Sequence, residues 1–258
     1  MTKSNIAVIM FPGNNCENET LRAAQAVGMT GKVLRWNTKE KLEDYDGYIL
    51  PGGWAYEDRV RAGIIPALDP IMDTIKEQAK AGKPVLGICN GCQVLIETGM
   101  IPGIKDKVQM ALAPNINPLV NGFYCTWVTI KNTGKPTAFT NRLEGEDIIP
   151  IPIAHGEGRF VTKDKDLLKE LIKNEQIIFQ YSDKEGNIDK NFPVNPNSSI
   201  ENIAGISNKK GNVLGMMPHP ERATWIRQLP EKPNKDMDSL APAAGIFKSM
   251  KHSIEKSN

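Results

Sequence analysis

A short apolar run that ends in a cysteine constrains this chain more than any other feature. Residues 84–88 read Pro-Val-Leu-Gly-Ile, which suits a buried strand, and the apolar spacing from Asn90 onward predicts a helix. Cys89 lies at the junction, between Gly87 and Gly91, where a missing Cβ permits a sharp turn. This pattern is typical of a nucleophile elbow, in which a strand delivers a reactive side chain to the N-terminus of a helix.

The chemistry expected at Cys89 follows from this position. A thiolate, rather than a thiol, is the nucleophile, and a helix N-terminus together with a nearby histidine favours the charged form. The backbone N–H of Asn90 would point towards an oxyanion that forms beside the sulfur. Taken by itself, Cys89 fits a buried structural cysteine equally well, so the interpretation depends on partners elsewhere in the chain.

Two of the three histidines belong to His-x-Glu triplets, His219-Pro-Glu221 and His155-Gly-Glu157. In an extended segment residues i and i+2 lie on the same side, and Pro220 restricts the backbone between His219 and Glu221. A carboxylate beside an imidazole fixes its tautomer and stabilises its charged form. The apolar strand before His219 is expected in the sheet near the elbow, which would bring together a nucleophile, a base and an orienting carboxylate.

A Pro-Gly-Gly turn at residues 51–53 follows another apolar strand. Ligands of open α/β sheets bind at the carboxyl ends of the strands, where glycine lets the backbone approach them closely. We therefore expect Gly52 and Gly53 at the binding site, with the Gly53 N–H as a second oxyanion donor. An ordinary turn is the plainer alternative.

Alternating strands and helices in the first hundred residues predict an α/β fold with a mostly parallel open sheet and helices on both faces. The expected strands cover residues 5–11, 32–36, 46–50 and 84–88, and the expected helices cover residues 16–27, 66–81 and the stretch from residue 90. Asn15 is expected to cap the first helix.

After Gly99 the pattern changes, and it predicts an antiparallel extension of the sheet. Strands are expected at residues 123–131, 148–154 and 176–181, a helix at 164–173, and a closing hairpin at 203–207 and 212–217, with loops at 101–122 and 183–200. We predict a single domain over residues 1–258, of which residues 228–258 form a C-terminal helical extension with a linker (228–239) and a last helix (240–254).

Composition excludes several classes of function. The 258 residues are 40% hydrophobic, which is enough for a sizeable core. Lys and Arg number 32 against 30 for Asp and Glu, and this near-neutral balance predicts neither nucleic acid nor a membrane as partner. We see no signal peptide and no membrane-length apolar run, and the four scattered cysteines suggest reduced thiols in a cytoplasmic protein.

Other chemistries fit the same residues less well. Cys89-Asn-Gly-Cys92 is a C-x-x-C pattern that would suit thiol–disulfide exchange, but this leaves the His219 triplet without a role. The His-x-Glu triplets and a thiolate match no standard zinc spacing, so no metal site is predicted. The sequence contains neither of the two common nucleotide-binding motifs, G-x-x-x-x-G-K-[ST] and G-x-G-x-x-G. Any ATP would therefore be bound by another polypeptide.

The motifs around Cys89 and His219 resemble those of the class I (triad) glutamine amidotransferase family. Within it, the chain looks most like the glutaminase subunits of phosphoribosylformylglycinamidine synthases. The supporting segments lie at residues 11–16, 50–53, 61–63, 87–91, 154–160, 202–205 and 215–222. There are departures: Cys92 stands where the family usually has Phe, Trp54-Ala-Tyr-Glu-Asp58 replaces Phe-Ser-Tyr-Gly-Asp, and Ser198 replaces a glycine. They leave open the details of the glutamine pocket and of the partner surface, and a redox role for Cys92 is open as well.

The resemblance implies a flavodoxin-like fold and roles for individual residues. Cys89 would be the nucleophile, His219 the general base and acid, and Glu221 the residue that orients it. Gly53 and Asn90 would donate to the oxyanion. The remaining substrate-binding residues would be Gly52, Gln93, His155, Gly156 and Glu157.

The resemblance also implies an activity and partners. Glutamine would be hydrolysed, and the ammonia would pass to a large ATP-dependent synthetase subunit, which holds ATP and Mg²⁺, in a complex with a small accessory subunit. That complex would convert formylglycinamide ribonucleotide to its amidine in purine biosynthesis, and this chain would hold no cofactor. A glutaminase for another acceptor and a stand-alone thiol hydrolase or peptidase remain alternatives.

Overall fold

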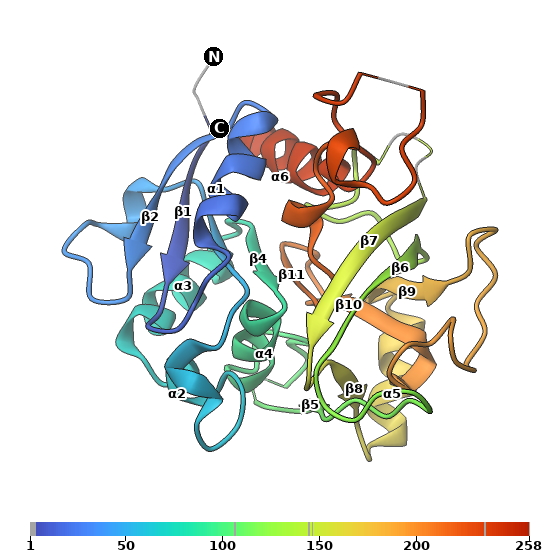
Figure 1. Ribbon diagram of the computed structural model, residues 1–258. Coiled ribbons are helices and arrows are strands. Elements are labelled where there is room, and N and C mark those ends of the chain that lie inside the picture. The colour runs from blue at the N-terminus through green and yellow to red at the C-terminus, as the bar shows by residue number, and fades with distance from the viewer. Residues whose placement is uncertain (1–3, 106, 144, 146, 235, 258) are drawn as a thin grey trace.

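The computed structural model describes residues 4–105, 107–143, 145, 147–234 and 236–257. Most strands belong to one sheet: β1 (Asn5–Met10), β2 (Thr30–Arg35), β3 (Gly47–Leu50), β4 (Val85–Ile88), β6 (Tyr124–Asn132), β7 (Ile148–His155), β9 (Ile177–Ser182), β10 (Ile203–Ser207) and β11 (Val213–Met216). Their order across the sheet is β2-β1-β3-β4-β11-β10-β9-β6-β7 (Figure 1). Two short strands, β5 (Ala111–Ala113) and β8 (Arg159–Val161), form a separate antiparallel pair.

The sheet has a parallel half and an antiparallel half, which confirms the predicted fold class. Strands β2, β1, β3, β4 and β11 run parallel, whereas β11, β10, β9, β6 and β7 pair antiparallel. Every residue of β3, β4 and β11 is buried, so both faces of the central sheet are covered, as a parallel sheet requires. The central strands therefore read as unbroken apolar runs.

The helices are α1 (Glu17–Ala26), α2 (Ile64–Ala67), α3 (Pro70–Lys80), α4 (Asn90–Glu97), α5 (Lys165–Lys173) and α6 (Ala244–Ser257). Helix α6 contacts α1, so the C-terminal segment packs beside the first helix of the chain (Figure 1). Its residues Phe247, Met250 and Ile254 are at most 2% exposed and belong to the main core cluster. No helix among the described residues is long and apolar enough to cross a membrane.

Several predicted boundaries were wrong, each for a local reason. Cys16, not Asn15, occupies the N-cap position of α1. The helix expected at 66–81 is two helices, because the Asp69 side chain accepts from the Ile71 N–H and caps a new helix with Pro70 in its first turn.

Two further differences lie in segments expected as loop or helix. The stretch expected as a loop at 101–122 contains β5, whose three residues are too few to show a period. The last helix begins at Ala244 rather than at residue 240, because Leu240 pairs with Trp225 and the Ala241 N–H donates to the Thr224 carbonyl.

Candidate active site

Cys89 lies where the central strand β4 turns into α4, as the elbow pattern predicts. Its backbone has φ 50° and ψ −106°, a conformation that is strained for a residue with a side chain. The flanking glycines make the turn possible: a Cβ on Gly91 would lie 2.0 Å from the Leu50 carbonyl oxygen, and one on Gly87 would lie 2.6 Å from the Gly91 carbonyl oxygen. The elbow therefore depends on close contacts that only glycine permits.

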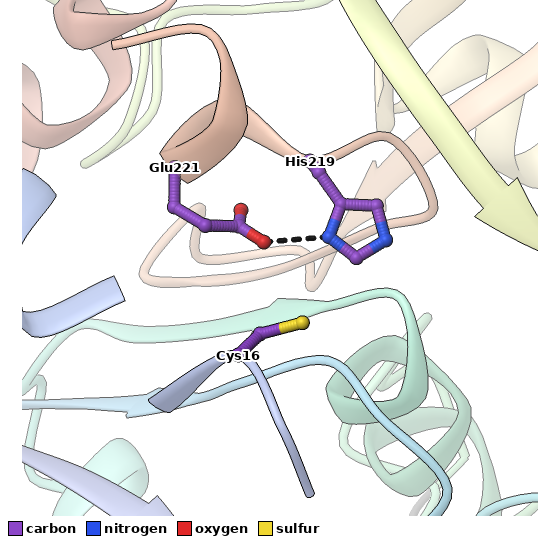
Figure 2. A group of neighbouring side chains, drawn as sticks. All are labelled: Cys16, His219 and Glu221. Atoms are coloured by element: carbon purple, nitrogen blue, oxygen red, sulfur yellow. Dashed lines mark hydrogen bonds and ion pairs between the residues drawn. The ribbon is translucent and has the colours of Figure 1, made fainter. Parts of the chain in front are cut away.

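His219 and Glu221 form a buried pair (Figure 2). The His219 Nδ1 atom lies 2.5 Å from Glu221 Oε1, and the two side chains are 2% and 0% exposed. The expected extended segment is instead a 3₁₀ turn over Pro220–Arg222, which Pro220 favours because its φ is fixed at a helical value. The pairing predicted from the triplet is present, although the backbone reaches it by a turn.

The parallel pairing of β4 with β11 brings this pair to the elbow. Met216 pairs with Ile88, so the segments that carry Cys89 and His219 leave the sheet at the same edge. A Cβ placed on Gly52 would lie 2.8 Å from His219 Cε1 and 3.5 Å from Cys89 Cβ. The cysteine, the histidine and Gly52 therefore meet at one point.

The charges around His219 decide its protonation. Burial alone would lower the pKa of His219, but the negative charge of Glu221, followed by that of Cys89, outweighs burial and holds this pKa well above its usual value. The ring of His219 is thus held as an imidazolium beside the Cys89 sulfur. A proton donor therefore lies next to the candidate nucleophile.

The backbone donors expected from Gly53 and Asn90 lie at the same edge. Gly53 forms an isolated antiparallel bridge with Asn14, but its two hydrogen bonds run from the Trp54 N–H to Gly13 and from the Asn15 N–H to Gly52. In this bridge geometry the Gly53 N–H points away from the paired segment. Asn90 is the first residue of α4, where helical N–H groups have no intrahelical acceptor.

The side chains of Asn90 and Gln93 are used to hold the site together. Asn90 Nδ2 donates to Gln93 Oε1 at 2.9 Å and to Asp58 Oδ1 at 3.1 Å. Gln93 Nε2 donates to the Glu157 carbonyl at 2.8 Å, which ties α4 to the loop after β7. These amides fix the walls of the site.

His155 is buried and held by a residue that the sequence analysis missed. Its Nδ1 lies 3.1 Å from Asn115 Oδ1, and Asn115 Nδ2 also donates to the His155 carbonyl at 2.6 Å. Burial, with the positive charge of His219, lowers the pKa of His155 to about 3, so its ring is neutral. Asn115 lies in the segment expected as a featureless loop, where no periodic pattern marks it.

A cavity of about 310 Å³ opens beside these groups. Its lining includes Gly53, Cys89, Gln93, His155, Gly156, Glu157 and His219 from the predicted set. Within the described part of the chain, Gly52, Asn90 and Glu221 do not line it directly. The predicted residues thus lie together at one edge of the sheet. Seven of them line the cavity, and the other three lie behind the lining residues.

The lining residues outside the predicted set include Cys16, Asp58 and Arg222. Burial raises the pKa of Asp58 to about 6, and the nearby charge of Glu157 adds to this effect. The Arg222 guanidinium donates to Cys16 Sγ at 3.1 Å and to Glu19 at 2.7 Å. Cys16, His219 and Glu221 also form the group of potential metal ligands that Figure 2 shows.

Cys92 lies behind the elbow and is fully buried. A Cβ on Gly215 of β11 would lie 2.8 Å from its sulfur, so Cys92 fills space between α4 and the sheet. This packing agrees with an apolar role for the residue.

Comparisons with known proteins agree with this geometry. Residues 3–252 match the sequence model of the CobB/CobQ-like glutamine amidotransferase domain. A phosphoribosylformylglycinamidine synthase subunit PurQ from Methanothrix thermoacetophila is 47% identical, over 97% of this chain and 98% of that protein. The subunit of the same name from Pyrococcus furiosus is 45% identical, over 84% of this chain and 88% of that protein. Among solved structures, PurLQS from Thermotoga maritima matches with a TM-score of 0.74 and 32% identity, over 96% of this chain and 98% of the matched chain.

Proposed function

Because this chain belongs to the CobB/CobQ-like glutamine amidotransferase family, we propose that it is the glutaminase subunit of a phosphoribosylformylglycinamidine synthase. The similarity extends over nearly the full length of the chain and of its relative from Methanothrix. The observation that carries the proposal is the meeting of Cys89, on its strained elbow, with the buried His219–Glu221 pair beside a small cavity.

In the proposed reaction, the Cys89 thiolate attacks the side-chain amide carbon of glutamine. The His219 imidazolium gives its proton to the leaving nitrogen, the carbon–nitrogen bond breaks, and ammonia leaves. Neutral His219 then takes a proton from water, whose oxygen attacks the γ-glutamyl thioester. Breaking the carbon–sulfur bond releases glutamate and restores the thiolate. The raised pKa of His219 suits the first proton transfer.

The N–H groups of Gly53 and Asn90 are the proposed donors to the tetrahedral oxyanion. Both belong to backbone fixed by its neighbours: a Cβ on Gly53 would lie 2.6 Å from Asn14 Cα, and the Asn90 side chain makes four hydrogen bonds. Donors that need no reorganisation stabilise developing charge most effectively. Gly52 supports them by leaving room for the His219 ring.

The remaining wall of the cavity suits the amino-acid part of glutamine. Asp58 and Glu157 interact through their charges, so the wall carries negative charge where an α-ammonium group needs a partner. Gln93 holds the Glu157 loop in place, and His155 and Gly156 line the cavity next to it. We assign these residues to substrate binding.

Ammonia needs an acceptor, and the relatives indicate which one. The PurQ relatives are named as synthase subunits, and the solved PurLQS structure is an assembly that includes the matched chain. We propose that a large synthetase subunit binds ATP and Mg²⁺ and receives the ammonia, that a small accessory subunit completes the complex, and that the complex works in the cytoplasm, where thiols stay reduced.

The decisive experiment replaces the nucleophile in the assembled complex. Cys89→Ala should abolish glutamine-dependent amidine synthesis while synthesis from added ammonium continues. Cys125→Ala removes an exposed free thiol and serves as the matched control. Normal glutamine turnover by Cys89→Ala would refute the assignment of the nucleophile, and peptide hydrolysis without glutamine turnover by the wild type would favour a stand-alone hydrolase.

A further inference from the structure

Cys16 lies in the site, but the glutaminase chemistry gives it no role. Its sulfur, a ring nitrogen of His219 and a carboxylate oxygen of Glu221 all lie within 4.8 Å of one another, and all three residues are buried (Figure 2). The Cys89 side chain borders the same space, because Cys16 Sγ and Cys89 Cβ lie 3.1 Å and 3.5 Å from the position of a Cβ on Gly52. Two thiols therefore face one imidazole.

The imidazole nitrogen that acts in the proposed reaction is also placed to bind a cation. Nδ1 of His219 is bound to Glu221, whereas Nε2 is buried and has no hydrogen-bond partner among the residues that the structure describes. A histidine whose other nitrogen is held by a carboxylate is the usual arrangement at a zinc site, where the carboxylate orients the ring and increases its basicity. The ring nitrogen that would bind a cation is thus already oriented.

We propose that Cys16, Cys89 and His219 form an inhibitory site for zinc or a similar thiophilic divalent cation, with both sulfurs and Nε2 as ligands. Both sulfurs bind as thiolates and Nε2 binds unprotonated, so the proton of the Cys16 thiol, the Nε2 proton of the His219 imidazolium and any proton on Cys89 pass to solvent as the bonds form, and no electron is transferred. A cation held in this way occupies the sulfur that glutamine needs. The inhibitory consequence rests on the proposed function, whereas the binding does not.

The donor set selects the cation. Thiolate and imidazole ligands suit zinc and cadmium, whereas magnesium and calcium prefer oxygen. Tetrahedral zinc with bonds of about 2.3 Å to sulfur and 2.0 Å to nitrogen holds its ligand atoms about 3.5 Å apart. Cys16 Sγ and a His219 ring nitrogen lie within 4.8 Å of each other, so this pair needs a shift of about 1 Å, and the Cys89 side chain, whose Cβ lies 3.5 Å from the position of a Cβ on Gly52, must turn towards them.

The charges nearby are compatible with a bound cation. The Arg222 guanidinium donates to Cys16 Sγ, and a thiolate still accepts this hydrogen bond when a metal is bound to it. Arg222 is also paired with Glu19, which offsets its charge. The cation would enter through the cavity, which Cys16, Cys89 and His219 all line.

The test is a cadmium titration of the reduced, chelator-treated full chain, followed by the ultraviolet absorption of cadmium–thiolate bonds. The wild type should show a band of two thiolates and bind one cadmium ion. Cys16→Ser should halve the band and weaken binding about tenfold or more, whereas the exposed Cys125→Ser should change neither. Zinc inhibition of glutaminase, measured in parallel, should weaken by the same factor in Cys16→Ser.

An unchanged band and affinity in Cys16→Ser would overturn the proposal. Crystals of the wild type soaked in zinc give a second answer that needs no variant: an anomalous peak within bonding distance of both sulfurs supports the site, and a peak on Cys89 without Cys16, or no peak, rejects it. Failure of the glutaminase assignment would appear as absent glutamine turnover with the cadmium band intact, so the two failures are distinguishable.

Discussion

The Nδ1 atom of His219 lies 2.5 Å from Glu221 Oε1, in a place where neither side chain is more than 2% exposed. A carboxylate this close to a buried imidazole holds its proton on Nδ1 and leaves Nε2 for the reaction. It also supplies the main charge that opposes the effect of burial on the pKa of the ring.

Glu221→Gln should therefore lower kcat/KM for glutamine by about 10²–10⁴-fold, because the imidazolium loses its counter-charge. The pKa of His219 should fall, and NMR titration of a chain with only three histidines can follow this directly. Glu231→Gln, at a side chain that is 80% exposed, is the control and should leave both unchanged. A variant with full activity and an unmoved His219 titration would contradict the proposed role.

The neutral, buried His155 makes stability depend on pH. Its pKa of about 3 in the folded chain lies below the value of about 6.5 in the unfolded chain, so the unfolded state takes up a proton first as the pH falls. The stabilising contribution is complete above about pH 6.5 and is lost as the pH falls towards 3. At pH 5 the loss amounts to about 2 kcal/mol.

Denaturant unfolding at pH 7 and pH 5 tests this expectation. His155→Gln has no charge to gain, so its free energy of unfolding should fall less between the two pH values than that of the wild type. An equal fall in both proteins would show that His155 is not responsible.

Gly52→Ala should displace the His219 ring, because the added methyl group would overlap with it. The new methyl group would lie 2.8 Å from His219 Cε1 and 3.1 Å from Cys16 Sγ. Overpacking of this kind costs about 1–3 kcal/mol of stability. We expect the imidazole to shift and glutamine turnover to fall by more than tenfold, about the effect of 1.4 kcal/mol on the barrier. Wild-type kinetics in a folded Gly52→Ala protein would contradict the close approach of these groups.

Helix α6 should contribute to the stability of the whole protein. Phe247 is fully buried in the main core, and Phe→Ala changes in such positions cost about 3–5 kcal/mol. Phe247→Ala should lower the free energy of unfolding by this amount, whereas Lys248→Ala, at an exposed neighbour, should change it by less than about 0.5 kcal/mol. Similar values for the two variants would mean that α6 is an accessory element.

The sequence predicted those parts of the fold that leave a local signal. The buried strands around the elbow and the hairpin before His219 were located within a few residues, because each is an apolar run bounded by glycine, proline or asparagine. The sequence analysis expected the strand before His219 near the elbow, and the structure shows that this strand, β11, pairs directly with β4. No local pattern reports which strands are neighbours.

The residues that the sequence analysis did not predict contact partners that are far away in the sequence. Asn115 lies in an irregular segment, and its partner His155 lies 40 positions away. Cys16 reaches Arg222 across 206 positions. No local sequence pattern indicates which distant residue an amide or a thiol in a loop will contact. The two His-x-Glu triplets, by contrast, could be recognised as short motifs.

The place of β11 between β4 and β10 has a consequence for the newly made protein. While the ribosome is still adding the second half, the elbow can form, but its cysteine has no imidazole to share a proton with. The strand that brings it, β11, is the last of the described strands in the sequence. A product truncated before β11 thus lacks the His219–Glu221 pair, and glutamine turnover at Cys89 requires synthesis to pass Glu221.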